Sequence, residues 1–149
     1  MSDELKARAL RLLARREHTR AELARKLAPL AGSPAELEAL LGMLEMRKQL
    51  SDERYAEARA HQLSRKFGAL RVRRELVAKG VEPETAARFA ADLEKADLER
   101  ARSILARKYR VPPSAPKERA RRARFLQSRG FSADVIRRSL ALAATEEFA

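Results

Sequence analysis

The sequence predicts an all-α protein in which three tandem three-helix repeats form an elongated, curved helical array. A helical phrase at residues 20–27 returns at 73–80 and, more loosely, at 124–131, and its central leucines lie 53 and 50 positions apart. Apolar residues keep the three-and-four spacing of amphipathic helices, and no segment alternates like a strand. We expect the repeats to span residues 1–49, 50–95 and 96–149. Modules of this kind bury their cores by stacking and present one long face to a partner.

The first repeat carries two capping-box spacings. Thr19 and Ser33 each precede a glutamate by three residues, at Glu22 and Glu36. In a capping box the hydroxyl accepts from a first-turn amide while the carboxylate reaches back to the cap residue. Pro34 fits the first helical position, where its missing N–H costs nothing. The expected apolar stripes are Leu5, Ala9, Leu12 and Leu13; Leu23, Leu27 and Leu30; and Leu37, Leu40, Leu41 and Leu44.

The second repeat opens with Ser51 as a cap, and Asp52 and Glu53 then place acids at the positive end of a helix dipole. Gly80 follows a helix at the position that favours a left-handed residue. Three helices are therefore expected here as well. Their apolar stripes are Ala56, Ala60, Leu63 and Phe67; Val72 and Leu76; and Ala86, Phe89, Ala90 and Leu93.

The third repeat is expected to contain a flexible connection between two of its helices. Residues 111–116 hold three of the six prolines, which marks a flexible connection that could let the most basic helices reposition. Gly130 is a helix stop and Ser132 caps the last helix. The apolar positions are Leu98, Ala101, Ile104 and Leu105; Phe125 and Leu126; and Val135, Ile136 and Leu140.

Charge and composition narrow the class of partner. The net charge is +12, and residues 100–138 hold 13 basic residues against two acids, a field suited to a polyanion or an acidic protein surface. The chain has no cysteine, which excludes disulfides and thiolate chemistry. It has no signal-peptide apolar region and no run of 18 apolar residues, so we expect a cytoplasmic protein without a membrane partner.

Four segments together resemble one known family. They are ALRLLARREHTRAELARKL (9–27), LSDERYAEARAHQ (50–62), GALRVRRELVAKGVEPE (68–84) and RARFLQSRGFSADVI (122–136), and they are similar to the RecX family of regulatory proteins in order and spacing. The resemblance implies three three-helix repeats. It also implies a protein that binds the RecA recombinase filament and restrains it. We therefore expect a non-enzymatic regulator of recombination, DNA repair and the SOS response that inhibits the filament's ATPase and strand exchange. The third repeat departs from the pattern, with Phe125 where the others have Glu22 and Glu75.

The residues that carry the resemblance are expected to be mainly structural. Glu75 and Lys79 lie four apart on one helix and are predicted to form a surface ion pair worth about 0.3 to 0.5 kcal/mol. Phe125 and Phe131 are interpreted as core residues, with base stacking as the weaker alternative. The full set is Asp52, Arg54, Tyr55, Glu75, Leu76, Lys79, Gly80, Phe125, Leu126, Arg129, Gly130 and Phe131.

Basic residues off the apolar stripes are the candidate interface. Stacked repeats could bring the recurring basic pairs to one side as a positive stripe that lies in the filament groove and touches acidic protein surface or DNA phosphate. The candidates are Arg15, Arg16, Arg65, Lys66, Arg71, Arg73, Arg74, Arg107, Lys108, Arg119, Arg121, Arg122 and Arg124. Inhibition could follow from blocked rearrangement, capped growth or exclusion of a second DNA strand. A monomer touching DNA weakly, or only within the filament, is expected.

Enzyme activity is the least favoured class. His18 and His61 are 43 positions apart and unsuited to a metal pair, no glycine-rich phosphate loop occurs, and no catalytic residue, cofactor or metal is expected. Two alternatives stay open. A sequence-independent or helix-turn-helix DNA-binding protein would bind free duplex with a steep salt dependence. A helical adaptor for another protein would bind in a way that survives salt and ignores DNA.

Overall fold

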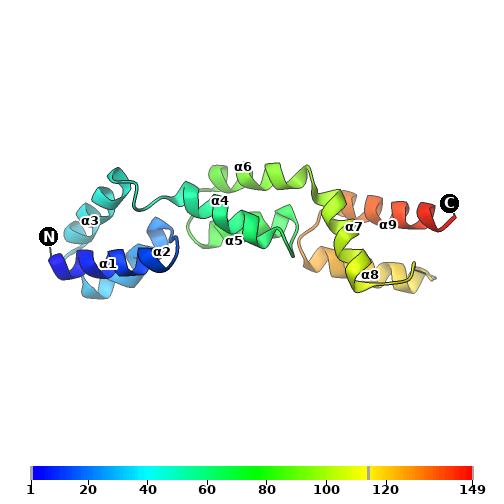
Figure 1. The fold of residues 1–149 in the computed structure, drawn as a ribbon, viewed down its shortest axis with the longest axis horizontal. Coiled ribbons are helices and arrows are strands. Elements are labelled where there is room, and N and C mark those ends of the chain that lie inside the picture. The colour runs from blue at the N-terminus through cyan, green and yellow to red at the C-terminus, as the bar shows by residue number, and fades with distance from the viewer. Residues whose placement is uncertain (1, 114, 149) are drawn as a thin grey trace.

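Nine α-helices form an elongated array in the computed structural model, which describes residues 2–113 and 115–148 (Figure 1). No strand occurs in these described residues, and the predicted all-α fold class is confirmed. The helices are α1 (Asp3–Arg15), α2 (Arg20–Leu27), α3 (Pro34–Met46), α4 (Asp52–Leu63), α5 (Ala69–Ala78), α6 (Pro83–Glu94), α7 (Asp97–Lys108), α8 (Pro116–Ser128) and α9 (Ala133–Phe148), with a 3₁₀ turn at Ala28–Leu30.

Three separate hydrophobic clusters follow one another along the array. The first joins α1, α2 and α3 and includes Leu50, the second joins α4, α5 and α6, and the third joins α7, α8 and α9. Leucine and alanine dominate the first two clusters, as a chain with few aromatic residues requires. Each cluster is thin, so the contacts between successive repeats decide how the array holds together.

The structure confirms the predicted hydroxyl caps but not the predicted return of the glutamate carboxylates to the cap residues. The hydroxyls of Thr19, Ser33 and Ser51 accept from the third following amide, as expected. The returning carboxylates are not part of a capping box. Glu22 binds the Arg16 guanidinium, and Glu36 accepts from the amides of residues 2 and 32. A guanidinium supplies two charge-assisted hydrogen bonds, which together are stronger than one bond from a backbone amide.

The first and second repeats meet at the amino terminus of α2. The Thr19 hydroxyl donates to the Lys79 carbonyl at 2.5 Å, and the Asp52 carboxylate accepts from the Arg20 amide at 2.7 Å. Gly80 has φ +101°, and a Cβ there would lie 2.5 Å from the Ala21 Cβ. Gly80 therefore ends α5 and also lets the turn after α5 touch α2 directly.

The second and third repeats meet in the same way at the amino terminus of α5. The Gly68 amide donates to the Arg129 carbonyl at 2.7 Å. The Asp97 carboxylate accepts from the Ala69 amide at 3.1 Å. Gly130 has φ +86°, and a Cβ there would overlap the backbone and Cβ of Arg71. We call these two contacts between repeats the first and second joints. Asp97 in the second joint corresponds to Asp52 in the first, and Gly130 corresponds to Gly80.

Alanine substitution at Gly80 should show how much the contact between the first two repeats stabilises the fold. The added Cβ meets Ala21 and forces an unfavourable positive φ, so Gly80→Ala should lower the free energy of unfolding by about 1 to 3 kcal/mol. Gly42→Ala is the control, because a Cβ at that helical position meets nothing within 4 Å. It should raise stability by about 0.5 to 1 kcal/mol. Urea unfolding measures the stability of both variants. Equal effects would contradict a stabilising role of the contact between Gly80 and Ala21.

Candidate interface along the basic face

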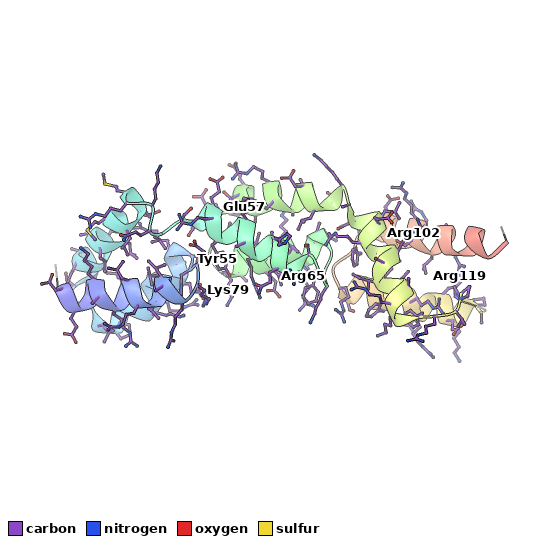
Figure 2. All side chains as sticks on the ribbon, in the orientation of Figure 1. Tyr55, Glu57, Arg65, Lys79, Arg102 and Arg119 are labelled. Carbon is purple, nitrogen blue, oxygen red and sulfur yellow. The ribbon has the colours of Figure 1, made fainter. Side chains whose placement is uncertain are left out.

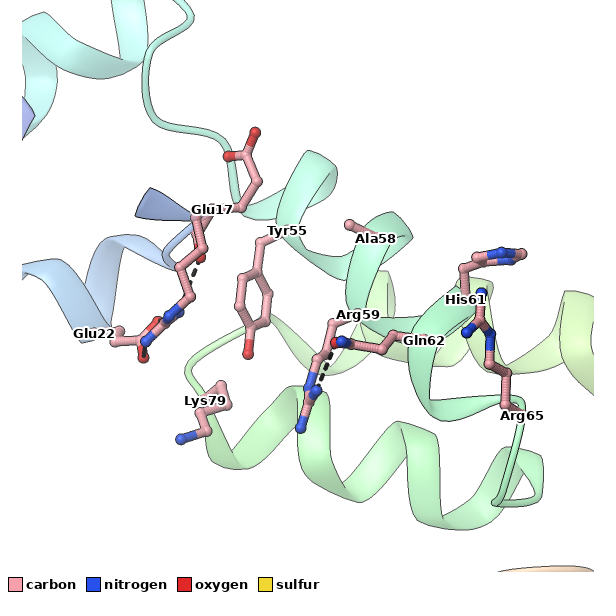
Figure 3. A pocket seen from close by; sticks show the side chains of 10 residues that line it. Glu17, Glu22, Tyr55, Ala58, Arg59, His61, Gln62, Arg65 and Lys79 are labelled. Atoms are coloured by element: carbon pink, nitrogen blue, oxygen red, sulfur yellow. Dashed lines mark hydrogen bonds and ion pairs between the residues drawn. The ribbon is translucent and has the colours of Figure 1, made fainter. Parts of the chain in front are cut away.

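The first candidate hollow lies where the first repeat meets the second. It has a volume of about 540 Å³ and combines residues from the α1–α2 connection, α2, α4 and the end of α5 (Figure 3). The Tyr55 side chain extends from α4 toward Lys79, and Arg59 lies one turn further along α4. The lining residues are Arg16, Glu17, Glu22, Tyr55, Ala58, Arg59, His61, Gln62, Arg65 and Lys79.

The two acids of this hollow are already paired. Glu22 is 4% exposed and receives hydrogen bonds of 2.6 and 3.1 Å from Arg16. The hydrogen bond from Arg16 lowers the pKa of Glu22 to about 2 and raises the pKa of Arg16. Glu17 accepts from Arg54 at 2.6 Å. The charge left to a partner in this hollow is therefore positive.

A second hollow of about 360 Å³ lies where the second repeat meets the third. Its lining holds five cations and no acid: Arg65, Lys66, Arg107, Lys108 and Arg129, with Ile104 and Phe125 as the apolar residues. Arg65 borders both this hollow and the first. Figure 2 shows Arg65 on the middle repeat, between Lys79 and Tyr55 on one side and the third repeat, with Arg102 and Arg119, on the other.

The second joint holds these cations together. The Arg100 guanidinium donates to the carbonyls of Ser64 and Phe67, at 2.6 and 2.8 Å, and pairs with Asp97. These carbonyls belong to the turn that follows α4, which contains Arg65 and Lys66. The turn is therefore fixed against α7. The predicted second and third basic pairs meet at one groove for this reason.

Two further hollows lie along α5. One, of about 430 Å³, is lined by Arg71, Arg74, Glu75, Ala78, Lys79, Gln127 and Ser128. The other, of about 440 Å³, is lined by Leu70, Arg73, Arg74 and Val77. Glu75 lies 3.6 Å from Arg71 and 3.9 Å from Arg59, so the predicted pair with Lys79 is wrong. Two guanidinium groups approach the carboxylate instead.

The thirteen candidates divide into three groups. Eight line the hollows: Arg16, Arg65, Lys66, Arg71, Arg73, Arg74, Arg107 and Lys108. Arg15, Arg121 and Arg124 are exposed but line none of these four hollows, and half-buried Arg119 donates to the Leu140 carbonyl. The prediction is wrong for Arg122, which is buried rather than exposed on the interface. It is 5% exposed, stacks 4.4 Å from the Tyr109 ring centroid and donates to the Val111 carbonyl at 2.8 Å.

The cations that line these four hollows, which we call the basic face, include residues that are not among the thirteen candidates. Arg59 is one of them, and it lies one turn after Tyr55 on α4. The sequence assigns Lys79 and Arg129 structural roles, yet their side chains also line hollows while their carbonyls accept hydrogen bonds in the joints. A signal was available for these two, because each is a cation that directly precedes a helix-ending glycine.

The aromatic and histidine residues have mainly structural surroundings. Phe131 is buried in the third core, whereas Phe125 is half-buried with Lys108 at 4.0 Å from its ring centroid. His18 is buried between the Arg16 carbonyl and Lys26, and His61 is exposed. Within the described part of the chain, no cluster of three His, Cys, Asp or Glu could hold a metal ion. The same residues include no helix long and apolar enough to cross a membrane.

The fold defines an all-helical protein of three tandem three-helix repeats with cation-lined hollows where the repeats meet. The models of the first, second and third three-helix domains of RecX match residues 6–29, 51–89 and 95–140. The regulatory protein RecX of Leptothrix cholodnii is 50% identical over 93% of this chain and 88% of its own length. That of Herbaspirillum seropedicae is 46% identical over 96% and 93%. The chain belongs to the RecX family.

A solved structure has the same fold. The crystal structure of RecX from Lactobacillus salivarius matches with a TM-score of 0.82 and covers 95% of this chain and 96% of that one, at 20% identity. A second structure, of a regulatory protein RecX, matches with a TM-score of 0.73 over 89% and 69%. The arrangement of three repeats is thus retained where most residues differ.

The Arg16–Glu22 pair should make stability depend on pH. Because the pKa of Glu22 is lowered to about 2 in the folded chain, its stabilising effect is present above about pH 4.5. It disappears as the pH falls toward 2. Glu22→Gln should cost about 1 to 2 kcal/mol at pH 7, a value reduced because Arg16 is half exposed, and nearly nothing at pH 2. Exposed Glu57→Gln is the control, and urea unfolding at both pH values provides the measurement.

Charge reversal should distinguish buried Arg122 from its exposed neighbour. Arg122→Glu places a carboxylate against Tyr109 and the Val111 carbonyl, so it should lower the free energy of unfolding by about 3 kcal/mol or more. Arg121→Glu, on the exposed side of α8, should change it by less than about 0.5 kcal/mol. Chemical denaturation followed by circular dichroism tests this, and similar losses in both variants would contradict the assignment.

Proposed function

We propose that this chain binds the RecA nucleoprotein filament through its basic face and inhibits the filament's ATPase and strand exchange. Membership of a family of regulatory proteins named RecX supports a regulatory role rather than an enzymatic one. The observation that carries the proposal is the groove between the second and third repeats. Five cations from two repeats surround it, and no acid lines it.

The groove has the positive charge that an anionic partner requires. Within the described residues, Arg65, Lys66, Arg107 and Lys108 make no ion pair. A partner that supplies carboxylates or phosphates would neutralise this cluster and release the mutual repulsion of its members. Because the two hollows share Arg65, one continuous surface of the partner could contact cations of neighbouring repeats.

The elongated shape favours inhibition by occupancy. An array of three repeats could span neighbouring filament subunits and obstruct the rearrangements that accompany nucleotide turnover. Capped growth and exclusion of a second DNA strand are compatible with the same contact. We propose that the chain acts in the cytoplasm as a monomer, and that DNA is a weak partner reached chiefly within the filament.

Charge reversal in the groove should separate this function from nonspecific attraction. Lys66→Glu, Arg107→Glu and Lys108→Glu together should raise the Kd for RecA filaments on single-stranded DNA at least about 10-fold. The control combines Arg8→Glu, Arg11→Glu and Arg25→Glu, which change net charge equally at exposed positions of α1 and α2. It should stay within about 3-fold of the native protein. Interferometry measures both constants.

Equal losses in the two triple variants would mean that net charge, not the groove, attracts the filament. A native protein that binds free DNA as tightly as it binds the filament would instead favour a general DNA-binding protein. Helical circular dichroism of every variant controls for folding.

A further inference from the structure

The outward face of α5 combines two exposed apolar side chains with two cations. Leu70 and Val77 are 43% and 41% exposed, whereas Val72 and Leu76 of the same helix are fully buried. Positions 70, 73, 74 and 77 have the spacing that places residues on one side of a helix. Their side chains line one shallow hollow of about 440 Å³ that contains no acid. We call these four residues the α5 patch.

The second repeat does not need the α5 patch for its own packing. Its core is built by Tyr55, Val72, Leu76, Val81 and other buried residues, and neither Leu70 nor Val77 belongs to that cluster. A β-branched valine also has a lower helix propensity than alanine or lysine at an exposed helical position. Stability of the isolated chain therefore does not explain an exposed Val77.

The two cations of the patch are available to a partner. Among the described residues, Arg73 and Arg74 make no ion pair. Arg74 also borders the neighbouring hollow with Arg71 and Lys79, so the patch adjoins the basic face. Complementary charge at the patch would therefore be negative, and the complementary centre would be apolar.

This combination selects a protein rather than a nucleic acid. A phosphate backbone could pair with the guanidinium groups but would leave Leu70 and Val77 without apolar contact. The two apolar residues are seven positions apart, or about 10 Å along the helix axis. An amphipathic helix packed along α5 presents apolar side chains at the same spacing, and acids beside that stripe would reach the two arginines.

We propose that the α5 patch docks an acidic amphipathic helix of the partner protein. Leu70 and Val77 receive its apolar stripe, and Arg73 and Arg74 pair with the flanking carboxylates. The identity of the partner as the recombinase filament rests on the proposed function above. The α5 patch then supplies apolar affinity beside the electrostatic attraction of the basic groove.

The test uses the full chain and RecA filaments assembled on single-stranded DNA, with Kd measured over a series of salt concentrations. Leu70→Ser with Val77→Ser should raise Kd about 10- to 50-fold at each salt concentration, with an unchanged slope of log Kd against log salt. Arg73→Ser with Arg74→Ser should raise Kd and also flatten that slope. Leu30→Ser with Met46→Ser is the matched control, because it removes two exposed apolar side chains from the first repeat. It should stay within about 2-fold.

A single conservative variant guards against misfolding. Val77→Ala raises helix propensity, so it should keep or increase the unfolding temperature while it raises Kd about 3-fold. Native affinity in both the Leu70/Val77 double variant and Val77→Ala would overturn the docking proposal and leave filament binding by the groove intact. Equal weakening of binding to free single-stranded DNA would assign the patch to nucleic acid and also overturn it. If the native chain fails to bind filaments, the proposed function falls, and the partner assigned here falls with it.

Discussion

The amino termini of α2 and α5 present backbone amides that their own helices cannot pair, and the following repeat supplies the missing partners. At α2 the Asp52 carboxylate accepts the Arg20 amide, and at α5 the Asp97 carboxylate accepts the Ala69 amide. A charge-assisted hydrogen bond of this kind contributes about 1 to 3 kcal/mol. Three thin cores are thereby coupled into one array.

The joints also determine the chemistry of the surface. Lys79 and Arg129 each precede a glycine with positive φ, and each offers its carbonyl to the joint. Their side chains then line the hollows on either side of the middle repeat. Arg100 adds a further restraint by holding the turn that contains Arg65 and Lys66. The basic face is thus a consequence of how the repeats meet.

Local sequence patterns predict the helices well. They carry no information about contacts between residues that are far apart in the sequence. Thr19, Ser33 and Ser51 mark helix starts because a cap involves only neighbouring residues. The Thr19 contact with Lys79 spans 60 positions, and no local spacing reports it. Glu22 could equally have paired with its cap residue, and only the approach of Arg16 decides the outcome.

The sequence pattern predicts an exposed Arg122, and the structure buries it for a related reason. The segment KERARRAR has basic residues at most positions and no apolar stripe that fixes which side of α8 faces the core. Buried Leu126 lies four positions later and was the available signal, since residues four apart share a helix face. An arginine can occupy such a position because its planar guanidinium stacks on Tyr109.

In the proposed function, the joined repeats present a basic face that restrains a recombinase filament. The most direct test measures DNA-dependent ATP hydrolysis by RecA while this chain is titrated at substoichiometric ratios, beside a basic helical protein of equal charge. We expect inhibition at ratios well below one chain per RecA subunit, and no inhibition by the control at those ratios. Inhibition only at amounts that saturate the DNA, or equal inhibition by the control, would contradict the account.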